Sequence, residues 1–548
     1  MQIIIPMSGF GERFRRAGYT VPKPLIEVDG KPIIAHVLDM FPGETDVVFI
    51  CNREHLCSTA MVEVLNYHCP TGKIIDIEPH KLGPVYAVSK AFERIDENLP
   101  TIVNYCDFTC YWDYSHFKQW LLDCGPDGCV PAYRGFHPHS LGNTNYAFMR
   151  VEDGWMREIQ EKKPFTENKL EEFASSGTYY FSQGRHVKRF FSEVMAKDYS
   201  VNGEFYCSVA YNLMVQAGLS VSVYELQHFM QWGTPEDLTE YMRYSDAFRA
   251  LATPATPLPP NNGSTLIPMA GRGSRFVQDG YHTPKPLLNV SGLPMVVQAA
   301  RCLPASENYQ FVVLENHFDT NEVQASIKKQ FPGAGFTLLE TITQGQACTC
   351  LAALEELAAD KPLTITACDH GVIFDTDQFT ALMSDPDVDI IVWASKGHPS
   401  AIKHSHMYGW LETLGDQVIG VSVKEPLHDP VNDPIIVGTF TFKRAEIFRA
   451  AAQKLILRDG RINGEFYVDS CLEDAISMGY RARVFLVDHY LCWGTPSDLK
   501  TFEYWQSCFH KWSTHPYQWQ EDRWRFDLDA RHPGHLQAVD AEPPCARP

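Results

Sequence analysis

The chain has 548 residues, of which 45% are hydrophobic and 21% charged, and its formal net charge at pH 7 is −20. Single hydrophobic cores rarely grow beyond about 250–300 residues, so this length predicts more than one domain. The acidic balance argues against a nucleic-acid-binding protein, which needs clustered Lys and Arg. A site for an anionic substrate must therefore gather its positive charge locally.

The 16 cysteines are scattered, without a C-x-x-C pair or zinc-finger spacing. The sequence opens directly on a strand-like run rather than a signal peptide, and no apolar stretch approaches the ~20 residues of a membrane span. These features predict a cytoplasmic protein with reduced thiols and no membrane partner. They leave homo-oligomerisation open.

The first strand-like run belongs to a long internal repeat. Residues 5–14 read IPMSGFGERF, and residues 267–276 read IPMAGRGSRF. A period this long indicates a duplicated domain, because solenoid units repeat every 20–50 residues or so. We therefore predict domains at 1–249 and 265–512, a Pro-rich polar linker at 250–264, and a partly disordered tail at 513–548.

Within each half, short β-rich runs alternate with helical segments. In the first half, strands are predicted at 3–6, 47–51, 74–77 and 101–105, and helices at 33–40 and 86–95. The strand set recurs at 266–269, 311–314, 336–339 and 363–367. This alternation predicts an α/β fold with a parallel-centred sheet, in which ligands bind beyond the carboxyl ends of the strands.

A glycine-rich turn follows the first strand of each half. In the first copy, Gly9 and Gly11 precede Arg13, and Lys23 follows in a Pro-Lys-Pro triplet. Glycines let backbone N–H groups face an oxyanion, Arg binds phosphate oxygens bidentately, and Lys adds a point charge. A lone G-x-G is often only a turn, but the full string occurs twice and favours a phosphate site. It is neither a dinucleotide fingerprint nor a Walker A loop.

An aspartate ends the fourth strand of each half, at Asp107 and Asp369. A carboxylate at this edge, facing a phosphate loop, suits Mg²⁺, which completes its shell with phosphate oxygens and water. The alternative is a simple strand-end cap, but the twin placement favours the metal. Asp113 and Asp375 also repeat, and they are predicted to cap the helices that follow.

Further short motifs recur in the same order. They are Gly83 and Gly345, Tyr146 and Tyr408, Lys162 and Lys424, Asn-Gly-Glu-Phe-Tyr at 202–206 and 463–467, and Trp-Gly-Thr-Pro at 232–235 and 493–496. With this series, the chain resembles the sugar-phosphate nucleotidyltransferases over most of residues 1–245 and 265–505. The resemblance implies two tandem three-layer α/β/α domains, GT-A-like and Rossmann-like, with mixed, mostly parallel central sheets.

The resemblance also implies the substrates: an NTP and a phosphorylated sugar or polyol, with Mg²⁺ as cofactor and pyrophosphate as product. The NDP-activated product would serve as a precursor of surface polysaccharide. The triphosphate would be held by Gly9, Gly11, Arg13 and Lys23 in one half, and by Gly271, Gly273, Arg275 and Lys285 in the other. Gly83 and Gly345 would lie near the base, and Asp107 and Asp369 would bind the metal. The acceptor would contact Tyr146, Glu161, Lys162 and Glu204, or Tyr408, Lys424 and Glu465.

Two departures from the family pattern leave alternatives open. Gln231 and Cys492 stand where a second metal aspartate is usual, and Cys492 is a poor ligand for Mg²⁺. Glu204, Glu465 and Asp469 are other candidates for that second metal contact. In addition, Glu425 follows Lys424, whereas Glu161 precedes Lys162.

The alternatives are therefore one active half beside a silent nucleotide-sensing or structural half, or a GT-A glycosyltransferase. Against the glycosyltransferase, no D-x-D triplet accompanies either strand-end aspartate. The pairs His137/His139 and His404/His406 favour a substrate-pocket loop over a zinc site, because no further ligand stands at zinc spacing. The tryptophans after residue 504 favour packing over nucleic-acid stacking.

Overall fold

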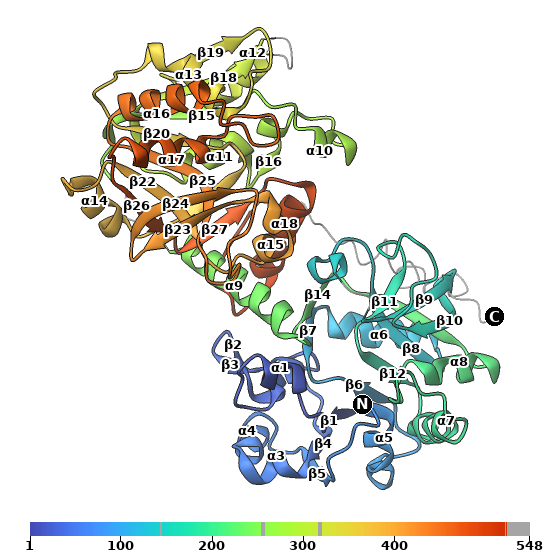
Figure 1. The fold of residues 1–548 in the computed structure, drawn as a ribbon. Helices are drawn as coiled ribbons and strands as arrows, with labels where there is room; N and C mark the ends of the chain where they lie inside the picture. Colours follow the sequence, from blue (N-terminus) through green and yellow to red (C-terminus); the bar gives the residue numbers. More distant parts are fainter. Residues whose placement is uncertain (143–144, 254–257, 316–319, 521, 523–548) are drawn as a thin grey trace. The chain divides into compact units, whose positions relative to one another are not determined.

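The computed structural model describes residues 1–142, 145–253, 258–315, 320–520 and 522 (Figure 1). The chain forms two compact units. The first comprises Met1–Ser245, Ser507–His515 and Asp522, and the second comprises Asp246–Gln506 and Pro516–Gln520. No helix among the described residues is long and apolar enough to cross a membrane.

The first unit is built on a ten-stranded mixed sheet in the order β11-β9-β10-β13-β8-β12-β6-β1-β4-β5. Its first strand in the sequence, β1, lies between β6 and β4, is the run QIIIPM and is buried at all six positions, as expected for a parallel strand covered on both faces. The strands are β1 (Gln2–Met7), β4 (Asp46–Asn52), β5 (Lys73–Ile77), β6 (Thr101–Asn104), β8 (Gly128–Tyr133), β9 (Ala147–Glu152), β10 (Trp155–Glu161), β11 (Phe173–Ser175), β12 (Thr178–Phe181) and β13 (Val221–Glu225). Strands β6, β1, β4 and β5 pair in parallel, as do β8 and β13, and antiparallel pairings join the rest.

The second unit repeats this sheet in the order β19-β18-β15-β20-β25-β22-β26-β24-β23. One long strand, β25, takes the place of both β12 and β11. The strands are β15 (Asn261–Pro268), β18 (Ser306–Leu314), β19 (Gly335–Leu339), β20 (Leu363–Thr366), β22 (Ile390–Ser395), β23 (Gly409–Leu414), β24 (Gln417–Val423), β25 (Ile435–Phe442) and β26 (Ala482–Leu486). The predicted strands and the mixed α/β fold are therefore confirmed in both halves.

Helices cover both faces of each sheet, which gives the predicted three layers (Figure 1). In the first unit, α5, α7 and α8 pack on one face with Tyr179 and Phe181, whereas Phe117 of α6 packs on Tyr180 from the other face. The helices of this unit are α1 (Glu12–Arg16), α2 (Ile33–Asp39), α3 (Arg53–Ser58), α4 (Met61–His68), α5 (Pro84–Ser89), α6 (Tyr114–Cys124), α7 (Gly184–Ala196) and α8 (Val209–Gln216). Those of the second are α10 (Ser274–Gln278), α11 (Met295–Arg301), α12 (Thr320–Lys328), α13 (Gln346–Ala353), α14 (Thr376–Ser384), α15 (Pro399–Lys403), α16 (Ala445–Leu457) and α17 (Val468–Ser477).

Small β-pairs and two longer helices complete the units. The ribbon β7 (Phe108–Tyr111) with β14 (His228–Gln231), and its counterpart β21 (His370–Ile373) with β27 (His489–Cys492), follow the two strand-end aspartates. The remaining elements are the pairs β2 (Glu27–Val28) with β3 (Lys31–Pro32) and β16 (Asn289–Val290) with β17 (Leu293–Pro294), and the helices α9 (Pro235–Ala252) and α18 (Pro496–Lys511).

The predicted linker and tail differ in part from the structure. Residues 250–252 end α9 and residues 261–264 begin β15, so secondary structure extends into the linker from both sides. Much of the predicted linker and tail cannot be compared in this way, because residues 254–257 and 523–548 lie outside the described residues. In the part of the tail that is described, His515 and Tyr517 are buried, because this segment packs as part of the fold.

The predicted helix caps are confirmed. The Asp113 side chain accepts a hydrogen bond from the backbone of His116 at the start of α6, and Asp375 accepts two at the start of α14. Both satisfy backbone donors that have no partner within the helix.

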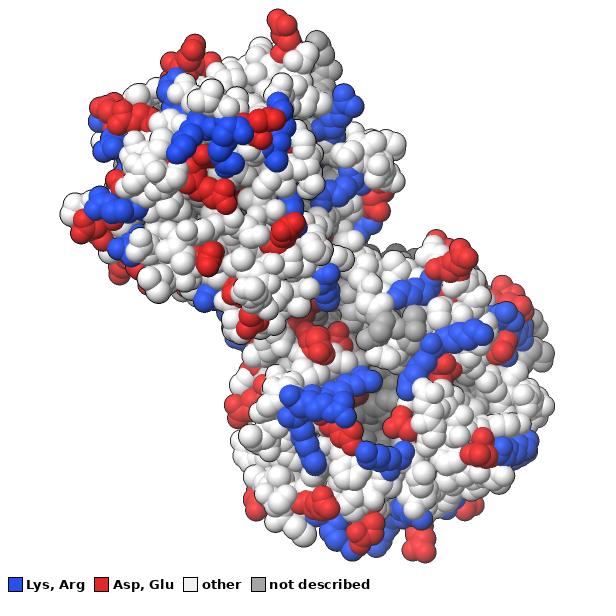
Figure 2. Space-filling model, viewed as in Figure 1, with Lys and Arg blue, Asp and Glu red and all other residues white. Residues whose placement is uncertain are grey.

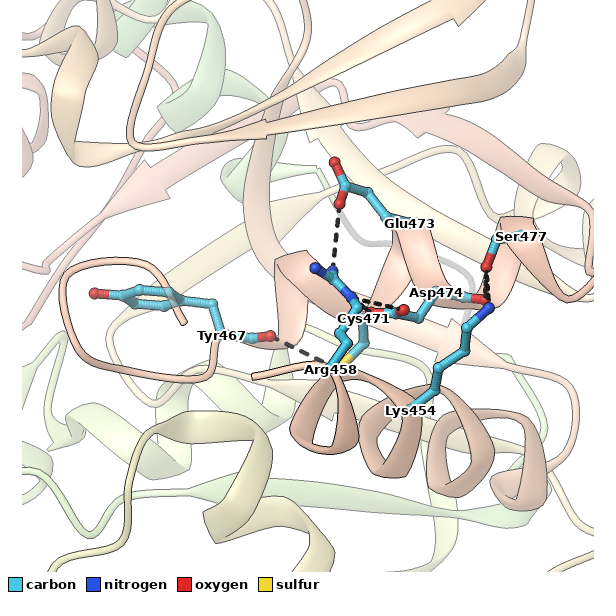
Figure 3. Close-up of polar contacts among 7 residues, drawn as sticks. All are labelled: Lys454, Arg458, Tyr467, Cys471, Glu473, Asp474 and Ser477. Carbon is cyan, nitrogen blue, oxygen red and sulfur yellow. Dashed lines mark hydrogen bonds and ion pairs between the residues drawn. The ribbon is translucent and has the colours of Figure 1, made fainter. Parts of the chain in front are cut away.

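Helices α16 and α17 of the second unit are joined by an ion pair (Figure 3). Arg458, which follows α16, donates from Nε to the two carboxylate oxygens of Asp474 on α17, at 2.8 and 2.9 Å. Lys454 on α16 donates to Ser477 Oγ at 2.5 Å, at the end of α17. The side chain of Asp474 is buried, so the arginine supplies the charged donor that its carboxylate cannot obtain from solvent.

Replacing Arg458 with Ala is expected to reduce the second unit's free energy of unfolding by about 1–3 kcal/mol, because a buried carboxylate loses its charged donor. Urea denaturation measures the effect. The matched control is Lys197→Ala in the first unit, where the position of Asp474 is taken by Leu213 and Lys197 forms an ion pair with Glu193. Equal losses in the two variants would contradict the importance of the buried pair.

Candidate active sites

A glycine loop lies beyond the carboxyl end of the first strand in each unit. Gly11 precedes α1 with φ +64°, and Gly273 precedes α10 with φ +60°, in the left-handed region that favours glycine. A Cβ placed on Gly9 or Gly271 would meet no atom within 4 Å. The loops are therefore open on this side, as a phosphate-binding loop needs to be.

Basic side chains gather over α1 in the first unit (Figure 2). Arg13, Arg15 and Arg16 are exposed on this helix, although the chain as a whole is acidic. In the second unit, Arg275 lies at the matching position of α10 and is also exposed. Positive charge is thus concentrated beside the glycine loop, as an anionic substrate requires.

A lysine and the strand-end aspartate form an ion pair in each site. Lys23 Nζ lies 2.8 Å from Asp107 Oδ2, and Lys285 Nζ lies 2.5 Å from Asp369 Oδ2. Burial is the largest effect on the pKa of Lys23 and lowers it, but the charges of Asp107 and Cys106 and the hydrogen bond to Asp107 together raise this pKa above its usual value. Burial alone would raise the pKa of Asp369, but the charge and hydrogen bond of Lys285, with His370 Nδ1 4.0 Å away, hold it well below its usual range. Lys23 and both members of the Lys285–Asp369 pair are therefore charged at neutral pH.

In the first unit, a carboxylate and an amide side chain lie together at the predicted metal position. A Cβ on Gly233 would lie 2.6 Å from the Gln231 amide nitrogen and 3.2 Å from Asp107 Oδ2. The Gln231 side chain and the carboxylate thus flank the same glycine. With the amide group turned so that its oxygen faces Asp107, the two side chains would offer oxygens that suit Mg²⁺. The residue types of the first unit therefore fit Mg²⁺, with Asp107 as the carboxylate ligand.

The second unit fits Mg²⁺ less well. A Cβ on Gly494 would lie 3.4 Å from Asp369 Oδ2 and 3.6 Å from Cys492 Sγ, so a thiol replaces the amide. Burial raises the pKa of Cys492, which keeps the sulfur protonated. In the described parts of the chain, no group of three or more His, Cys, Asp or Glu side chains is placed to hold a metal.

The repeated Asn-Gly-Glu-Phe-Tyr motif packs against the glycine that the sequence predicts to lie near the base. Gly83 precedes α5 with φ +85°, and a Cβ there would lie 2.7 Å from the backbone nitrogen of Phe205. Phe205 N donates to Leu82 O at 2.9 Å, and Val85 N donates to Phe205 O at 3.1 Å. The second unit has the same arrangement, with Gly345 against the backbone of Phe466. These backbone contacts explain why both motifs recur together.

Replacing Gly83 with Ala is expected to reduce the first unit's free energy of unfolding by about 1–3 kcal/mol, because the residue has a positive φ and no room for a methyl group. It should also weaken NTP binding there, measured by titration with a fluorescent nucleotide. Gly9→Ala is the control for stability, since Gly9 has no positive φ and no close neighbour. Unfolding curves for Gly83→Ala that match those of the wild type would contradict the close packing.

The predicted acceptor lysines occupy matching places. Both have left-handed backbones, with φ +60° at Lys162 and +65° at Lys424, and their backbone nitrogens donate to Tyr146 O and Tyr408 O. Lys162 Nζ donates to Tyr206 Oη at 2.6 Å, and that hydroxyl donates to Glu204. Lys424 Nζ donates instead to the backbone oxygen of Met407. The structure thus joins Glu204 to Lys162 through Tyr206.

Glu161 lies next to Lys162 at the end of β10. Ser208, just before α8, donates to its Oε1 at 2.6 Å. Burial raises the pKa of Glu161 to about 7, against the opposing effects of Ser208 and Lys162. A half-buried carboxylate beside a lysine is a suitable acceptor for substrate hydroxyl groups.

The structure also reveals a contact that the repeat did not predict. His80 Nε2 lies 3.1 Å from Ser8 Oγ in the glycine loop, and the Leu82 backbone nitrogen donates to His80 Nδ1 at 3.1 Å. His80 thus bridges the two segments proposed to hold the nucleotide. Ala270 and Ile342 take these positions in the second unit and cannot form the bridge. Only a comparison of the halves where they differ would have singled out His80.

Each unit therefore places a glycine loop, a Lys–Asp pair and a second lysine on one α/β/α fold, which defines the class of nucleotidyltransferases. The family profile described as "MobA-like NTP transferase domain" matches residues 3–159 and 265–431, more than half of the chain. The chain belongs to this family, with one copy of the domain in each half.

Curated relatives are similar at low identity. "Mannose-1-phosphate guanyltransferase beta-B" of Xenopus laevis is 26% identical over 257 residues, covering 45% of this chain and 66% of that protein. "Bifunctional protein GlmU" of Janthinobacterium sp. is 26% identical over 239 residues, covering 43% of this chain and 48% of that protein. The chain thus spans just under two thirds of the first relative and about half of the second.

Among solved structures, a nucleoside-diphosphate-sugar pyrophosphorylase from Vibrio cholerae RC9 is 21% identical, with a TM-score of 0.38. The match covers 44% of this chain and 100% of that one.

Proposed function

We propose that the chain joins the nucleoside monophosphate part of an NTP to a phosphorylated sugar or polyol, with release of pyrophosphate. The observation that carries this proposal is the doubled Lys–Asp pair beside an open glycine loop, at Lys23–Asp107 and Lys285–Asp369. Membership of the NTP transferase family and the names of the relatives support the same reaction.

The reaction is an in-line displacement at the α-phosphorus of the NTP. An oxygen of the acceptor's phosphate forms the new P–O bond, and the bond to the β-phosphate bridging oxygen breaks, so that pyrophosphate leaves with that electron pair. A phosphate monoester carries a charge of about −1.5 to −2 at pH 7, so no general base is needed. The barrier is electrostatic repulsion between two anions and their misalignment.

The basic residues of the site would lower both the repulsion between the two anions and the cost of aligning them. Arg13 and Lys23 would neutralise the triphosphate, and Lys162 would orient the acceptor's phosphate. In the free protein, Lys23 is paired with Asp107, so binding of the triphosphate would give the lysine a second anionic partner. Mg²⁺ held by Asp107, with Gln231 beside it, would neutralise charge that develops on the phosphate oxygens. The NDP-activated product would serve the synthesis of surface polysaccharide precursors.

A panel of NTPs and acceptors tests the proposal on the whole protein. Pyrophosphate release is measured with ATP, CTP, GTP, UTP and dTTP against mannose 1-phosphate, glucose 1-phosphate, N-acetylglucosamine 1-phosphate and glycerol 3-phosphate. We expect release with at least one pair, dependent on both substrates. Release that depends on the NTP alone would contradict acceptor transfer.

A second function, specific to the second unit, is favoured by the thiol of Cys492 beside Asp369. In this alternative, the second unit binds nucleotide without turning it over. Comparison of Asp107→Ala with Asp369→Ala distinguishes the two functions. If the second unit is silent, the Asp107→Ala protein should release no pyrophosphate, while its second unit should still bind nucleotide.

A further inference from the structure

The predicted acceptor regions of the two units differ in the secondary-structure element that carries their acidic residue. In the first unit, Glu161 ends β10 and faces Ala147 on β9 across the strand pair. Ser208, before α8, completes the group by donating to Glu161 at 2.6 Å. The strand therefore supplies the carboxylate, and the helix supplies a hydroxyl.

The second unit reverses this arrangement. Val423 ends β24 in place of Glu161 and faces Gly409 on β23 in place of Ala147. Asp469, in the first turn of α17, takes the position of Ser208. A carboxylate is thus lost from the strand and gained on the helix opposite it.

The replacement of Ala147 by Gly409 in the second unit makes room for Asp469. A Cβ on Gly409 would lie only 2.3 Å from Asp469 Oδ2 and 3.2 Å from its Cγ. The carboxylate therefore occupies the space that the methyl group of Ala147 fills in the first unit. Gly409 has no positive φ, so the backbone itself does not require glycine here. The glycine and the aspartate form a matched pair of changes.

The surroundings of Asp469 are those of a binding group rather than of a solvated helix-terminal acid. Its side chain is half-buried and within electrostatic range of Lys424, the predicted phosphate-binding lysine. Burial raises the pKa of Asp469 to about 6, against the opposing charge of Lys424. By contrast, Glu425 is exposed, although it is adjacent to Lys424 in sequence.

We propose that Asp469 binds a hydroxyl group of the second unit's acceptor, in the role that Glu161 has in the first unit. This inference rests on the proposed function and names the group that selects the acceptor. Because the carboxylate comes from the helix and not from the strand, the hydroxyl group must approach from a different direction. The two units are therefore expected to prefer different hydroxylated phosphomonoesters.

The test uses the full chain with Asp107→Ala and Arg13→Ala, so that turnover reports on the second unit. The acceptor panel of mannose 1-phosphate, glucose 1-phosphate, N-acetylglucosamine 1-phosphate and glycerol 3-phosphate identifies its best acceptor by pyrophosphate release. Adding Asp469→Asn should raise the KM for that acceptor about 10- to 100-fold, the usual scale for losing a hydrogen bond to a charged group. The KM for the NTP should remain within about twofold.

Two variants control the interpretation. Glu425→Gln, at the exposed neighbour of Lys424, should leave the acceptor KM unchanged. Gly409→Ala should raise it as Asp469→Asn does, because the methyl group displaces the carboxylate, whereas Ala147→Gly in the first unit should not change the acceptor KM of the second. Thermal unfolding confirms that each variant is folded.

A triple variant tests the acceptor selectivity of the second unit directly. Combining Gly409→Ala, Val423→Glu and Asp469→Ser rebuilds the first unit's arrangement and should shift the second unit's preference toward the acceptor of the first. Turnover with an acceptor KM that Asp469→Asn leaves unchanged would overturn this inference alone. No turnover with any acceptor in the Asp107→Ala, Arg13→Ala protein would overturn the proposed function of the second unit, and this inference with it.

Discussion

Asp107→Ala is expected to lower turnover by the first unit by at least about 10³-fold, because the reaction loses the carboxylate proposed to hold its metal ion. The substitution also releases Lys23 from its ion pair, so binding of the NTP should persist while catalysis fails. The measurement is Mg²⁺-dependent pyrophosphate release with the acceptor that the first unit uses. Asp369→Ala should have the corresponding effect on the second unit.

Asp113→Ala is the matched control for a nearby acidic residue. Asp113 caps α6, so its loss should cost about 0.5–2 kcal/mol of stability and leave turnover close to that of the wild type. If the Asp107→Ala, Asp369→Ala double variant keeps full pyrophosphate release, the metal assignment is wrong in both units.

Arg13→Ala is expected to reduce turnover by the first unit about 10²–10³-fold, the usual scale for removing one charged contact to the transition state. Arg13→Lys should recover only part of this loss, because lysine lacks the planar fork that binds two phosphate oxygens. Rates with saturating and limiting NTP separate the effect on kcat from the effect on KM.

Arg15→Ala provides the comparison on the same helix. Arg15 is exposed and lies over the ring of Phe10, with its guanidinium carbon 5.9 Å from the ring centroid. Its loss should change turnover by less than about threefold, within the range of exposed charge contacts. Equal activity of the Ala and Lys variants at position 13 would show that Arg13 is not a phosphate ligand.

Much of the fold and of the candidate sites could be predicted because the chain repeats itself. The twin motifs predicted the strand-end position of Asp107 and Asp369, and the structure places Lys23 and Lys285 directly against them. Apolar runs such as residues 3–6 predict buried strands, since a strand covered on both faces is apolar at nearly every position. The assignment of these residues to metal and nucleotide remains a prediction.

Contacts between distant segments could not be predicted in the same way. The pairing of Gly83 with Phe205 depends on backbone atoms 122 residues apart in the sequence, and no side-chain pattern reports them. The sequence offers Asp469 as one candidate for the second metal contact, and it gives no sign of what the structure shows, which is that Asp469 lies near Lys424 and against Gly409. Its position follows from the helix opposite β24, which the order of motifs does not reveal.

The domain boundaries also depend on contacts between segments that are distant in the sequence. The repeat assigned residues up to 512 to the second domain, but Ser507–His515 belong to the first unit. There, Ser507 lies 3.1 Å from Nε2 of the buried His228, and Phe509 packs on Tyr241. The duplicated sequence has no counterpart for such a returning segment, so periodicity alone could not identify it.

The fate of labelled phosphate tests the central claim most directly. The whole protein is incubated with the preferred acceptor and with NTP carrying ³²P at either the α- or the γ-phosphate. The account predicts that the α-label appears in the acceptor product and the γ-label in pyrophosphate, in equal amounts. Transfer of the γ-label to the acceptor, or release of a nucleoside diphosphate in place of pyrophosphate, would contradict it.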